Sequence, residues 1–118
     1  MRSPFVALCL TSLLIASACG GAGAPASPTP APTANVDYQG FKASPLTLEI
    51  AKGTKVTWTN KDSATHTVTS GTNRQGDGRF DGQIAPGETL SFTFADAGTF
   101  EYFCGRHSSM VGFKVVVK

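Results

Sequence analysis

Three side chains able to bind a soft or borderline metal ion lie within seven residues near the C-terminus. Cys104, His107 and Met110 follow one another at intervals of three. On a helix this spacing would place them on one face, where a methionine usually belongs to the core. Gly105 and Ser108 are poor residues for a helix interior. The segment therefore predicts a tight loop that folds all three side chains toward one centre.

One further histidine, His66, is the only other imidazole in the chain. In its strand pattern His66 is in phase with the apolar Val68, and Cys104 is in phase with Tyr102. Both side chains are therefore expected to point inward, close to strand ends. The alternative reading for Cys104 is a buried, inert cysteine that behaves as a small hydrophobe.

Two imidazoles, a thiolate and a thioether form a distinctive donor set. Structural zinc sites use Cys, His and carboxylates, and a thioether is not among their usual ligands. Two His and one Cys in a plane with a weak axial Met describe a blue-copper electron-transfer site. Four protein donors leave no open position, and no Glu or further His is expected nearby as an acid or base. We therefore predict one copper ion and an electron carrier rather than an enzyme, with candidate ligands His66, Cys104, His107 and Met110.

The elements that must position these side chains are strands. Apolar and polar residues alternate in five stretches, at 46–50, 56–59, 90–94, 99–102 and 113–117. Turn signals such as Lys52-Gly53 and Pro86-Gly87 separate these stretches, and no window of ten residues has helical periodicity. Many short strands at this spacing predict an all-β, Greek-key sandwich or barrel. The Gly- and Asp-rich segment 76–82 lacks calcium-loop spacing and is predicted to be a flexible turn.

Length and charge exclude several classes of protein. The chain has 118 residues and a formal net charge of +2, with ten Lys and Arg against eight Asp and Glu. This length suits one core rather than several, which excludes a large multidomain enzyme. The basic residues are dispersed, so no stripe is present that would neutralise several phosphates. We expect no nucleic-acid partner.

The N-terminus has the pattern of an export signal. Residues 5–18 are small or apolar apart from Thr and Ser, and this run is too short to span a membrane. Ala16-Ser17-Ala18 fits an ordinary cleavage site, and the same residues with Cys19 resemble a lipoprotein signal, although Ala16 stands where Leu is usual. We predict a signal peptide over 1–18 and favour lipidation of Cys19. The protein would then be periplasmic or on the cell surface, reaching the membrane through a lipid anchor at most.

A linker and one folded domain would follow the signal. Residues 19–35 are rich in Gly, Ala and Pro and carry no large apolar side chain before the strand pattern starts, which favours an extended tether. The folded domain is predicted to span 36–118. Within it Cys104 is the single cysteine, so an internal disulfide is impossible there.

The stretch from Val36 to Lys118 resembles the small cupredoxins of the plastocyanin and amicyanin type. The matching motifs are a Val-Thr-Trp-Thr-Asn strand at 56–60, His66-Thr67-Val68, Pro86-Gly87-Glu88 and the run from Gly98 through Cys104, His107, Met110 and Gly112. The short Cys-to-Met loop is similar to that of amicyanin, whereas plastocyanin has a longer one.

The resemblance implies an eight-stranded Greek-key sandwich with His66, Cys104 and His107 as equatorial copper ligands and Met110 as the axial one. Two departures stand out. Ser108 occupies the position after the second His where the family often has Pro. That Pro influences how freely the His moves on reduction, so its replacement bears on the tuning of the reduction potential. The segment Gly112–Val115 is one residue longer than usual, which predicts a shifted register or a bulge in the last strand.

The function expected from these observations is an exported, monomeric carrier of single electrons between redox proteins such as c-type cytochromes or oxidoreductases. Two alternatives stay open, a copper-delivery protein with the same ligands and a metal-free interaction module in which the ligands fill the core. Thr67 is expected either to bond to the ligand loop or to face solvent. Glu101 and Arg106 either shape a docking surface or are simply solvated.

Overall fold

The computed structural model describes residues 29–118, and this range consists of strands and connecting loops without a helix. The predictions for a signal peptide over 1–18, for lipidation of Cys19 and for the first part of the linker lie outside the described residues. The strands are β1 (Thr33–Tyr38), β2 (Ala43–Ser44), β3 (Thr47–Ile50), β4 (Thr54–Asn60), β5 (His66–Thr72), β6 (Gln75–Ile84), β7 (Thr89–Phe94), β8 (Gly98–Phe103) and β9 (Phe113–Val117). The all-β prediction is confirmed.

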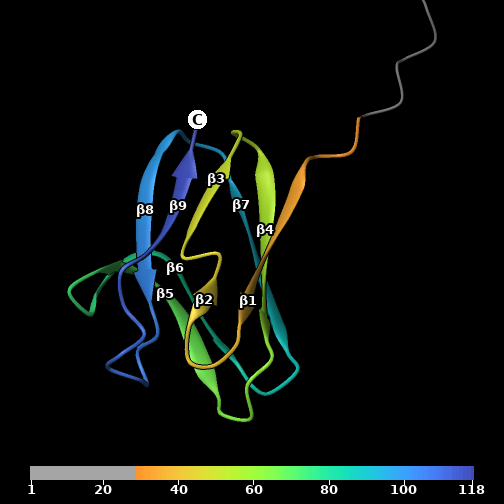
Figure 1. Cartoon of the computed structure of the whole chain (residues 1–118). Coiled ribbons are helices and arrows are strands. Elements are labelled where there is room, and N and C mark those ends of the chain that lie inside the picture. The colour runs from red at the N-terminus through yellow and green to blue at the C-terminus, as the bar shows by residue number, and fades with distance from the viewer. Residues whose placement is uncertain (1–28) are drawn as a thin grey trace, which may run out of the picture.

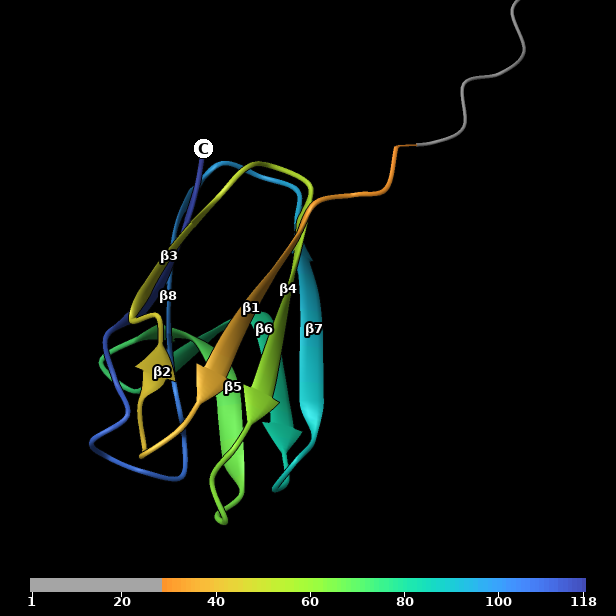
Figure 2. The same ribbon diagram turned by 45° about the vertical axis from the view of Figure 1, so that its right-hand side comes forward.

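The strands form two mixed sheets that face each other, as Figures 1 and 2 show. One sheet has the order β2-β1-β4-β7, and the other has the order β3-β9-β8-β5-β6. Two pairs are parallel, β1 with β4 and β3 with β9, while the remaining pairs are antiparallel. The described range has nine strands where eight were expected, because a two-residue strand, β2, pairs with the end of β1.

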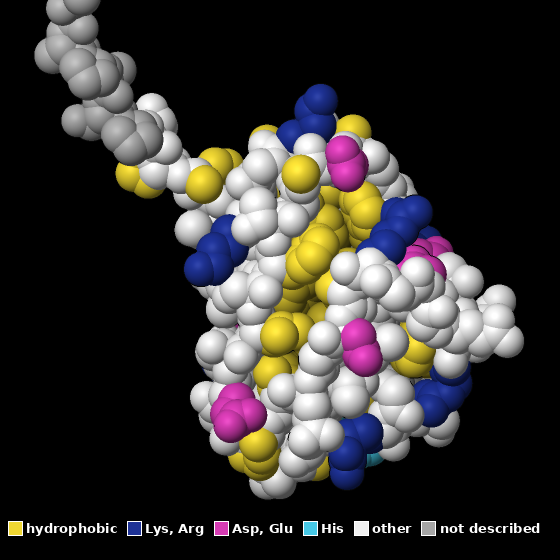
Figure 3. Space-filling model, turned by 180° about the vertical axis from the view of Figure 1, so that it is seen from behind, with side chains coloured by type: hydrophobic (Ala, Val, Ile, Leu, Met, Phe, Trp, Pro, Cys, Tyr) yellow, Lys and Arg dark blue, Asp and Glu magenta, His cyan; other side chains and the backbone are white. Residues whose placement is uncertain are grey.

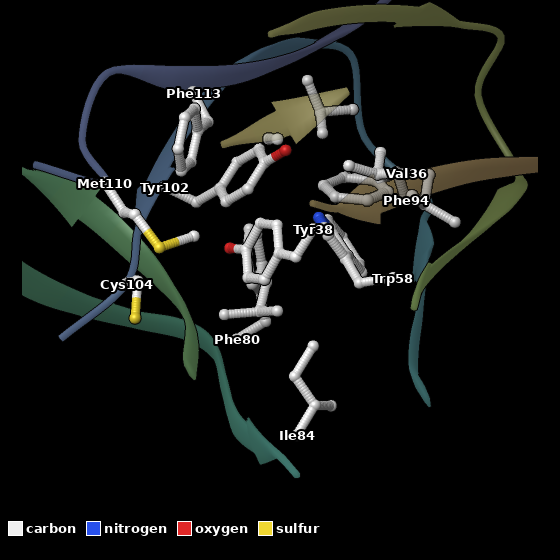
Figure 4. Close-up of a cluster of buried hydrophobic side chains, with 14 of the residues drawn as sticks. Val36, Tyr38, Trp58, Phe80, Ile84, Phe94, Tyr102, Cys104, Met110 and Phe113 are labelled. Atoms are coloured by element: carbon white, nitrogen blue, oxygen red, sulfur yellow. The ribbon is translucent and has the colours of Figure 1, made fainter. Parts of the chain in front are cut away.

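Large aromatic side chains fill the space between the sheets (Figure 4). Trp58 of β4 is fully buried and packs against Phe80, Phe94 and Tyr102 with ring centroids 5.5–6.3 Å apart. Burying an aromatic side chain removes about 150–250 Å² from water, which gives about 4–6 kcal/mol before ordering entropy is subtracted. This core fixes the two sheets against each other and makes a rigid base for the loops at their ends.

The longest strand, β6, is where the sequence prediction was wrong. Gly76–Gly82 was expected as a flexible turn, but the segment belongs to this strand: Gly76, Asp81 and Gly82 lie opposite residues of β5, and the four residues between Gly76 and Asp81 form the irregular part of the pairing. Ser70 in β5 holds it in place, because its hydroxyl accepts the backbone N–H groups of Arg79 and Phe80 at 3.1 and 2.9 Å. Tertiary pairing therefore overrides the weak strand propensity of the glycines.

The last strand shows no bulge. The register of β8 and β9 runs unbroken from Gly98 opposite Val117 to Tyr102 opposite Phe113, so the last strand contains no bulge between its paired residues. Gly112, with a φ of 77°, belongs instead to the loop before β9. The irregular register lies between Thr69 and Gly71, in the β5–β6 hairpin.

Candidate metal centre

The candidate ligands meet at one end of the sandwich. β5 and β8 are antiparallel neighbours, so the start of β5 lies beside the end of β8. His66 is the first residue of β5, and Cys104 directly follows β8. We call residues 104–110, which run from Cys104 to Met110, the ligand loop. Two residues 38 positions apart in sequence are thus brought together by strand pairing.

Three donor atoms form a nearly regular triangle. The Nδ1 atoms of His66 and His107 are 3.1 Å apart, and Cys104 Sγ lies 3.7 Å from the first and 3.5 Å from the second. A point equidistant from three atoms so placed is about 2 Å from each, close to the length of metal–imidazole and metal–thiolate bonds. When both Nδ1 atoms are unprotonated, their lone pairs repel each other, and a bound cation removes that repulsion. The triangle therefore fits a metal ion.

Met110 lies beside this triangle. Its side chain is fully buried, as are those of His66 and Cys104, while His107 is partly exposed. The backbone N–H of Cys104 donates to the Met110 carbonyl at 2.9 Å, and the N–H of Met110 donates to the His107 carbonyl at 3.1 Å. Figure 4 shows Met110 and Cys104 at the same edge of the core cluster. All four predicted residues are thus brought together, on the border between core and surface.

Asp62 orients the His66 ring, a contact that no motif in the sequence predicts. His66 Nε2 lies 2.9 Å from a carboxylate oxygen of Asp62 in the β4–β5 loop. When Nε2 carries the proton and donates it to this carboxylate, Nδ1 presents its lone pair to the triangle, a common outer-shell arrangement for metal-binding histidines. Burial alone would raise the pKa of Asp62, but hydrogen bonds from the Phe41 amide, the His66 ring and the Gly40 amide outweigh it and lower that pKa.

Phe41 covers the two imidazoles. Its ring meets His66 and His107 edge to face, with centroids 5.4 and 5.0 Å apart, and Tyr38 meets His66 in the same way at 5.4 Å. The Phe41 backbone has a φ of 58°, and its N–H donates to Asp62 at 3.0 Å. The same carboxylate therefore fixes both the ligand ring and the aromatic ring over it. Phe41 itself is 43% exposed, so its outer edge faces solvent.

Thr67 forms a hydrogen bond across to the ligand loop, which was one of the two arrangements left open by the sequence. Its hydroxyl accepts the backbone N–H of Gly105 at 2.7 Å, and its own N–H donates to Cys104 Sγ at 3.3 Å. The second bond matters chemically, because hydrogen bonding to the cysteine sulfur tunes the potential of a blue-copper site. Of the two readings left open for Thr67, the structure supports contact with the loop.

The other charged residues singled out from the sequence lie at the surface. Arg106 donates to the side-chain oxygen of Gln83 at 3.0 Å, and Glu101 is 3.5 Å from Lys114. Arg74, which the sequence analysis missed, reaches the ligand loop from the β5–β6 turn. Its position depends on how the hairpin folds back over the loop, and no sequence motif marks that contact.

A surface groove of about 550 Å³ lies at the opposite end of β8 from Cys104. It is lined by Phe92, Phe94 and Phe100, with the Arg79 guanidinium 5.0 Å from the Phe100 ring centroid. Figure 3 shows apolar side chains in a groove on the back of the molecule. No candidate ligand lines this groove, so it is separate from the metal centre.

Comparison with known proteins identifies the family. Residues 6–117 match the family model described as a cupredoxin-like domain. The chain belongs to the cupredoxin family. Amicyanin from Paracoccus denitrificans is 34% identical to this cupredoxin over 84 residues, which cover 70% of this chain and 63% of amicyanin. Chloroplastic plastocyanin from Tetradesmus obliquus is 36% identical over 83 residues, covering 63% of this chain and 57% of that protein. The match thus spans less than two thirds of either relative.

Solved structures agree with the family. A purple cupredoxin from Nitrosopumilus maritimus has a TM-score of 0.65 and 33% identity to this cupredoxin, over 72% of this chain and 99% of that one. An amicyanin variant described in its Cu(I) form has a TM-score of 0.64 and 31% identity, over 73% of this chain and 82% of that one. The predicted sandwich is therefore a cupredoxin fold. In the part of the chain that the structure describes, no helix is long and apolar enough to cross a membrane.

Proposed function

We propose that this cupredoxin carries single electrons between redox partners through one copper ion held by His66, Cys104, His107 and Met110. The observation that carries the proposal is the triangle of two Nδ1 atoms and one Sγ atom, with separations of 3.1, 3.5 and 3.7 Å, beside a buried methionine. The family membership supports the choice of copper, and the donor set does so independently, because thiolate and thioether ligands suit Cu(I) while imidazole also suits Cu(II).

The chain's own residues hold the donors in a fixed arrangement. Copper, when bound, would supply a one-electron couple between Cu(II) and Cu(I). His66 is held by its place in β5 and by the hydrogen bond to Asp62. Cys104 is held by two hydrogen bonds, one from its own backbone N–H to the Met110 carbonyl and one from the Thr67 N–H to its sulfur. Such constraints keep the donors from rearranging between oxidation states, which favours fast electron exchange. Four protein donors leave no position for a substrate, so we assign carriage rather than catalysis.

Electrons would enter and leave at the exposed side of the centre. His107 is the one candidate ligand with partial exposure, and the outer edge of Phe41 lies beside it. Together the two rings give a partner protein an apolar approach to the copper. We propose that the partners are redox proteins such as c-type cytochromes or oxidoreductases, and that the cupredoxin acts as a monomer.

The proposal includes export. A signal peptide over 1–18, a lipidated Cys19, a linker over 19–35, whose last three residues already belong to β1, and a copper domain over 36–118 would place the carrier in the periplasm or on the cell surface. The sequence pattern of residues 5–19 supports this assignment. Mass spectrometry of the N-terminus of the protein purified from membranes tests it. A diacylglycerol-modified Cys19 is expected, and a mature chain that starts elsewhere without lipid would contradict the anchor.

Electron transfer is tested by mixing the copper-loaded, reduced protein with an oxidised c-type cytochrome in a stopped-flow instrument. We expect rapid, second-order reduction of the cytochrome, and a Cys104→Ser variant treated with copper in the same way should not support it. Slow reduction by the copper-loaded protein, combined with ready transfer of Cu(I) to a chelator, would contradict the carrier function and favour copper delivery.

A further inference from the structure

Arg74 occupies an unusual backbone position next to the metal centre. It lies with Asn73 in the turn between β5 and β6, and the two residues have φ angles of 62° and 51°. Two-residue hairpin turns of this kind favour Asn and Gly, because other side chains are disfavoured at positive φ. A long, charged side chain is kept here against that preference. Strained positions of this sort persist where surrounding contacts fix them.

The guanidinium group of Arg74 binds the ligand loop. Nη1 donates to the His107 carbonyl at 3.1 Å and lies 3.5 Å from the Cys104 carbonyl, and Nη2 donates to the Gly105 carbonyl at 3.0 Å. One side chain thus spans three backbone acceptors, two of which belong to candidate ligands. A planar group with five N–H donors suits this arrangement, whereas the ammonium group of lysine is a single point of charge.

These contacts act on a segment outside the strands. The structure assigns no strand between Cys104 and Gly112, so the backbone groups of the ligand loop need partners other than a sheet ladder. Thr67 holds the Gly105 N–H from one side, and Arg74 holds the Gly105 carbonyl from the other. The loop is therefore fixed between the start of β5, where Thr67 lies, and the turn between β5 and β6, where Arg74 lies.

We propose that Arg74 is a positioning residue for the metal centre: its guanidinium fixes the backbone of Cys104, Gly105 and His107, and thereby the thiolate and the exposed imidazole. The inference rests on the proposed copper-binding function for its consequence, but the loop contacts themselves do not depend on copper. Removal of the planar group should free the loop while leaving the sandwich intact.

Arg106 provides a matched control. It carries the same charge and belongs to the ligand loop itself, but its guanidinium donates to the Gln83 side chain of β6 rather than to a backbone carbonyl of the loop. Arg106→Gln therefore removes a positive charge near the centre and one side-chain contact with β6, and it leaves every hydrogen bond from Arg74 to the loop backbone in place. Arg74→Lys does the reverse, because it keeps the charge and loses the planar group.

The first experiment measures amide hydrogen exchange in the full chain without added metal, for wild type, Arg74→Gln, Arg74→Lys and Arg106→Gln. We expect the Gly105 and Met110 amides to exchange roughly 10-fold faster in both Arg74 variants, with Trp58 of the core strand as an unchanged internal reference. Wild-type exchange at Gly105 and Met110 in Arg74→Gln would overturn the proposal. Equal acceleration at Trp58 would overturn it too, because the effect would then be global destabilisation.

The second experiment measures the release of Cu(I) to a chelator from the same four proteins. Loss of an outer-shell contact typically weakens metal binding by roughly 10-fold or more, so release should be faster by about that factor in both Arg74 variants and unchanged in Arg106→Gln. Full retention in Arg74→Lys, or an equal effect in Arg106→Gln, would show that charge rather than positioning matters and would overturn the proposal. If no variant binds copper while the exchange result holds, the failure lies in the proposed function alone.

Discussion

The two sides of the candidate metal centre are built in different ways. On the strand side, His66 belongs to β5, is fully buried, and has its second ring nitrogen held by the Asp62 carboxylate. On the loop side, Cys104 and His107 belong to the ligand loop, whose backbone depends on contacts with Thr67 and Arg74. His107 is also the one candidate ligand that is partly exposed.

The difference separates two tasks. The strand side is fixed by a sheet ladder and by the rings of Tyr38 and Phe41, which contact His66 edge to face, so it would set the position of the metal and exclude water. The loop side reaches the surface, where a partner can approach, and a few hydrogen bonds must hold it. Substitutions on the strand side should therefore affect whether the site forms, whereas those on the loop side should affect how firmly it is held.

Replacing each histidine by glycine should give the largest contrast. His107→Gly opens a gap toward solvent, so added imidazole should enter and restore the intense visible band of the Cu(II) protein. His66→Gly leaves a gap enclosed by Phe41, Tyr38 and Asp62, so imidazole should not restore the band. The absorption spectrum with and without imidazole measures the effect. Equal rescue of both variants would remove the distinction between the two sides.

Asp62→Asn should weaken copper binding by roughly 10–100-fold, because the carboxylate that accepts from His66 Nε2 is lost. The affinity is measured by competition with a chelator. Asp37→Asn is the control, since Asp37 forms only a surface ion pair with Lys61 at 2.6 Å, which is worth about 0–1 kcal/mol. A similar loss of affinity in both variants would contradict the orienting role of Asp62.

Asp62→Asn should also change the free energy of unfolding in a way that depends on pH. The pKa of Asp62 is lowered in the folded protein, so its charged form contributes stability that is fully present above the unfolded value of about 3.9. That contribution is lost as pH falls through the lower, folded pKa. The difference in unfolding free energy between wild type and Asp62→Asn should therefore shrink from pH 7 to pH 3 in urea unfolding. A constant or growing difference would show that the Asp62 charge does not stabilise the fold.

Thr67→Val should have the smallest effect of the set. It leaves the Gly105 N–H without its acceptor, which should cost about 1 kcal/mol of unfolding free energy and leave the copper band in place. Thr57→Val removes a hydroxyl that contacts Ser91 at 2.8 Å on the exposed face, and it should be nearly neutral. Denaturant unfolding compares the two. If Thr57→Val lowers the free energy of unfolding as much as Thr67→Val does, the hydrogen bond from the loop to Thr67 does not stabilise the protein more than a surface hydroxyl contact.

Much of the sandwich could be predicted from alternating side chains, because strands such as β4 and β9 bury one face. β6 could not be predicted, because its glycine-rich sequence shows no alternation of apolar and polar side chains. Its pairing depends instead on Ser70 and on the hairpin with β5. Leu46 was expected in the alternating stretch 46–50, but it precedes β3 and is 58% exposed. Local pattern thus predicts strands that bury a face and misses an edge strand fixed by pairing.

The four candidate ligands could be predicted from the sequence because two imidazoles, a thiolate and a thioether form a distinctive donor set. Their supporting residues were not, because each acts across a contact that no short motif encodes. Asp62 binds His66 together with the amides of the β1–β2 turn, and Arg74 reaches the ligand loop only through a hairpin whose turn has positive φ angles. Thr67 was noticed because it directly follows a candidate ligand.

We propose that His66, Cys104, His107 and Met110 converge on one copper ion. The most direct test is a titration of the purified protein with Cu(II), followed by visible absorption. An intense thiolate-to-copper charge-transfer band should saturate at one equivalent, bleach with ascorbate, and be absent in Cys104→Ser, whose β fold is retained by circular dichroism. A pale spectrum typical of ordinary Cu(II) complexes, or a band that survives in Cys104→Ser, would contradict the claim.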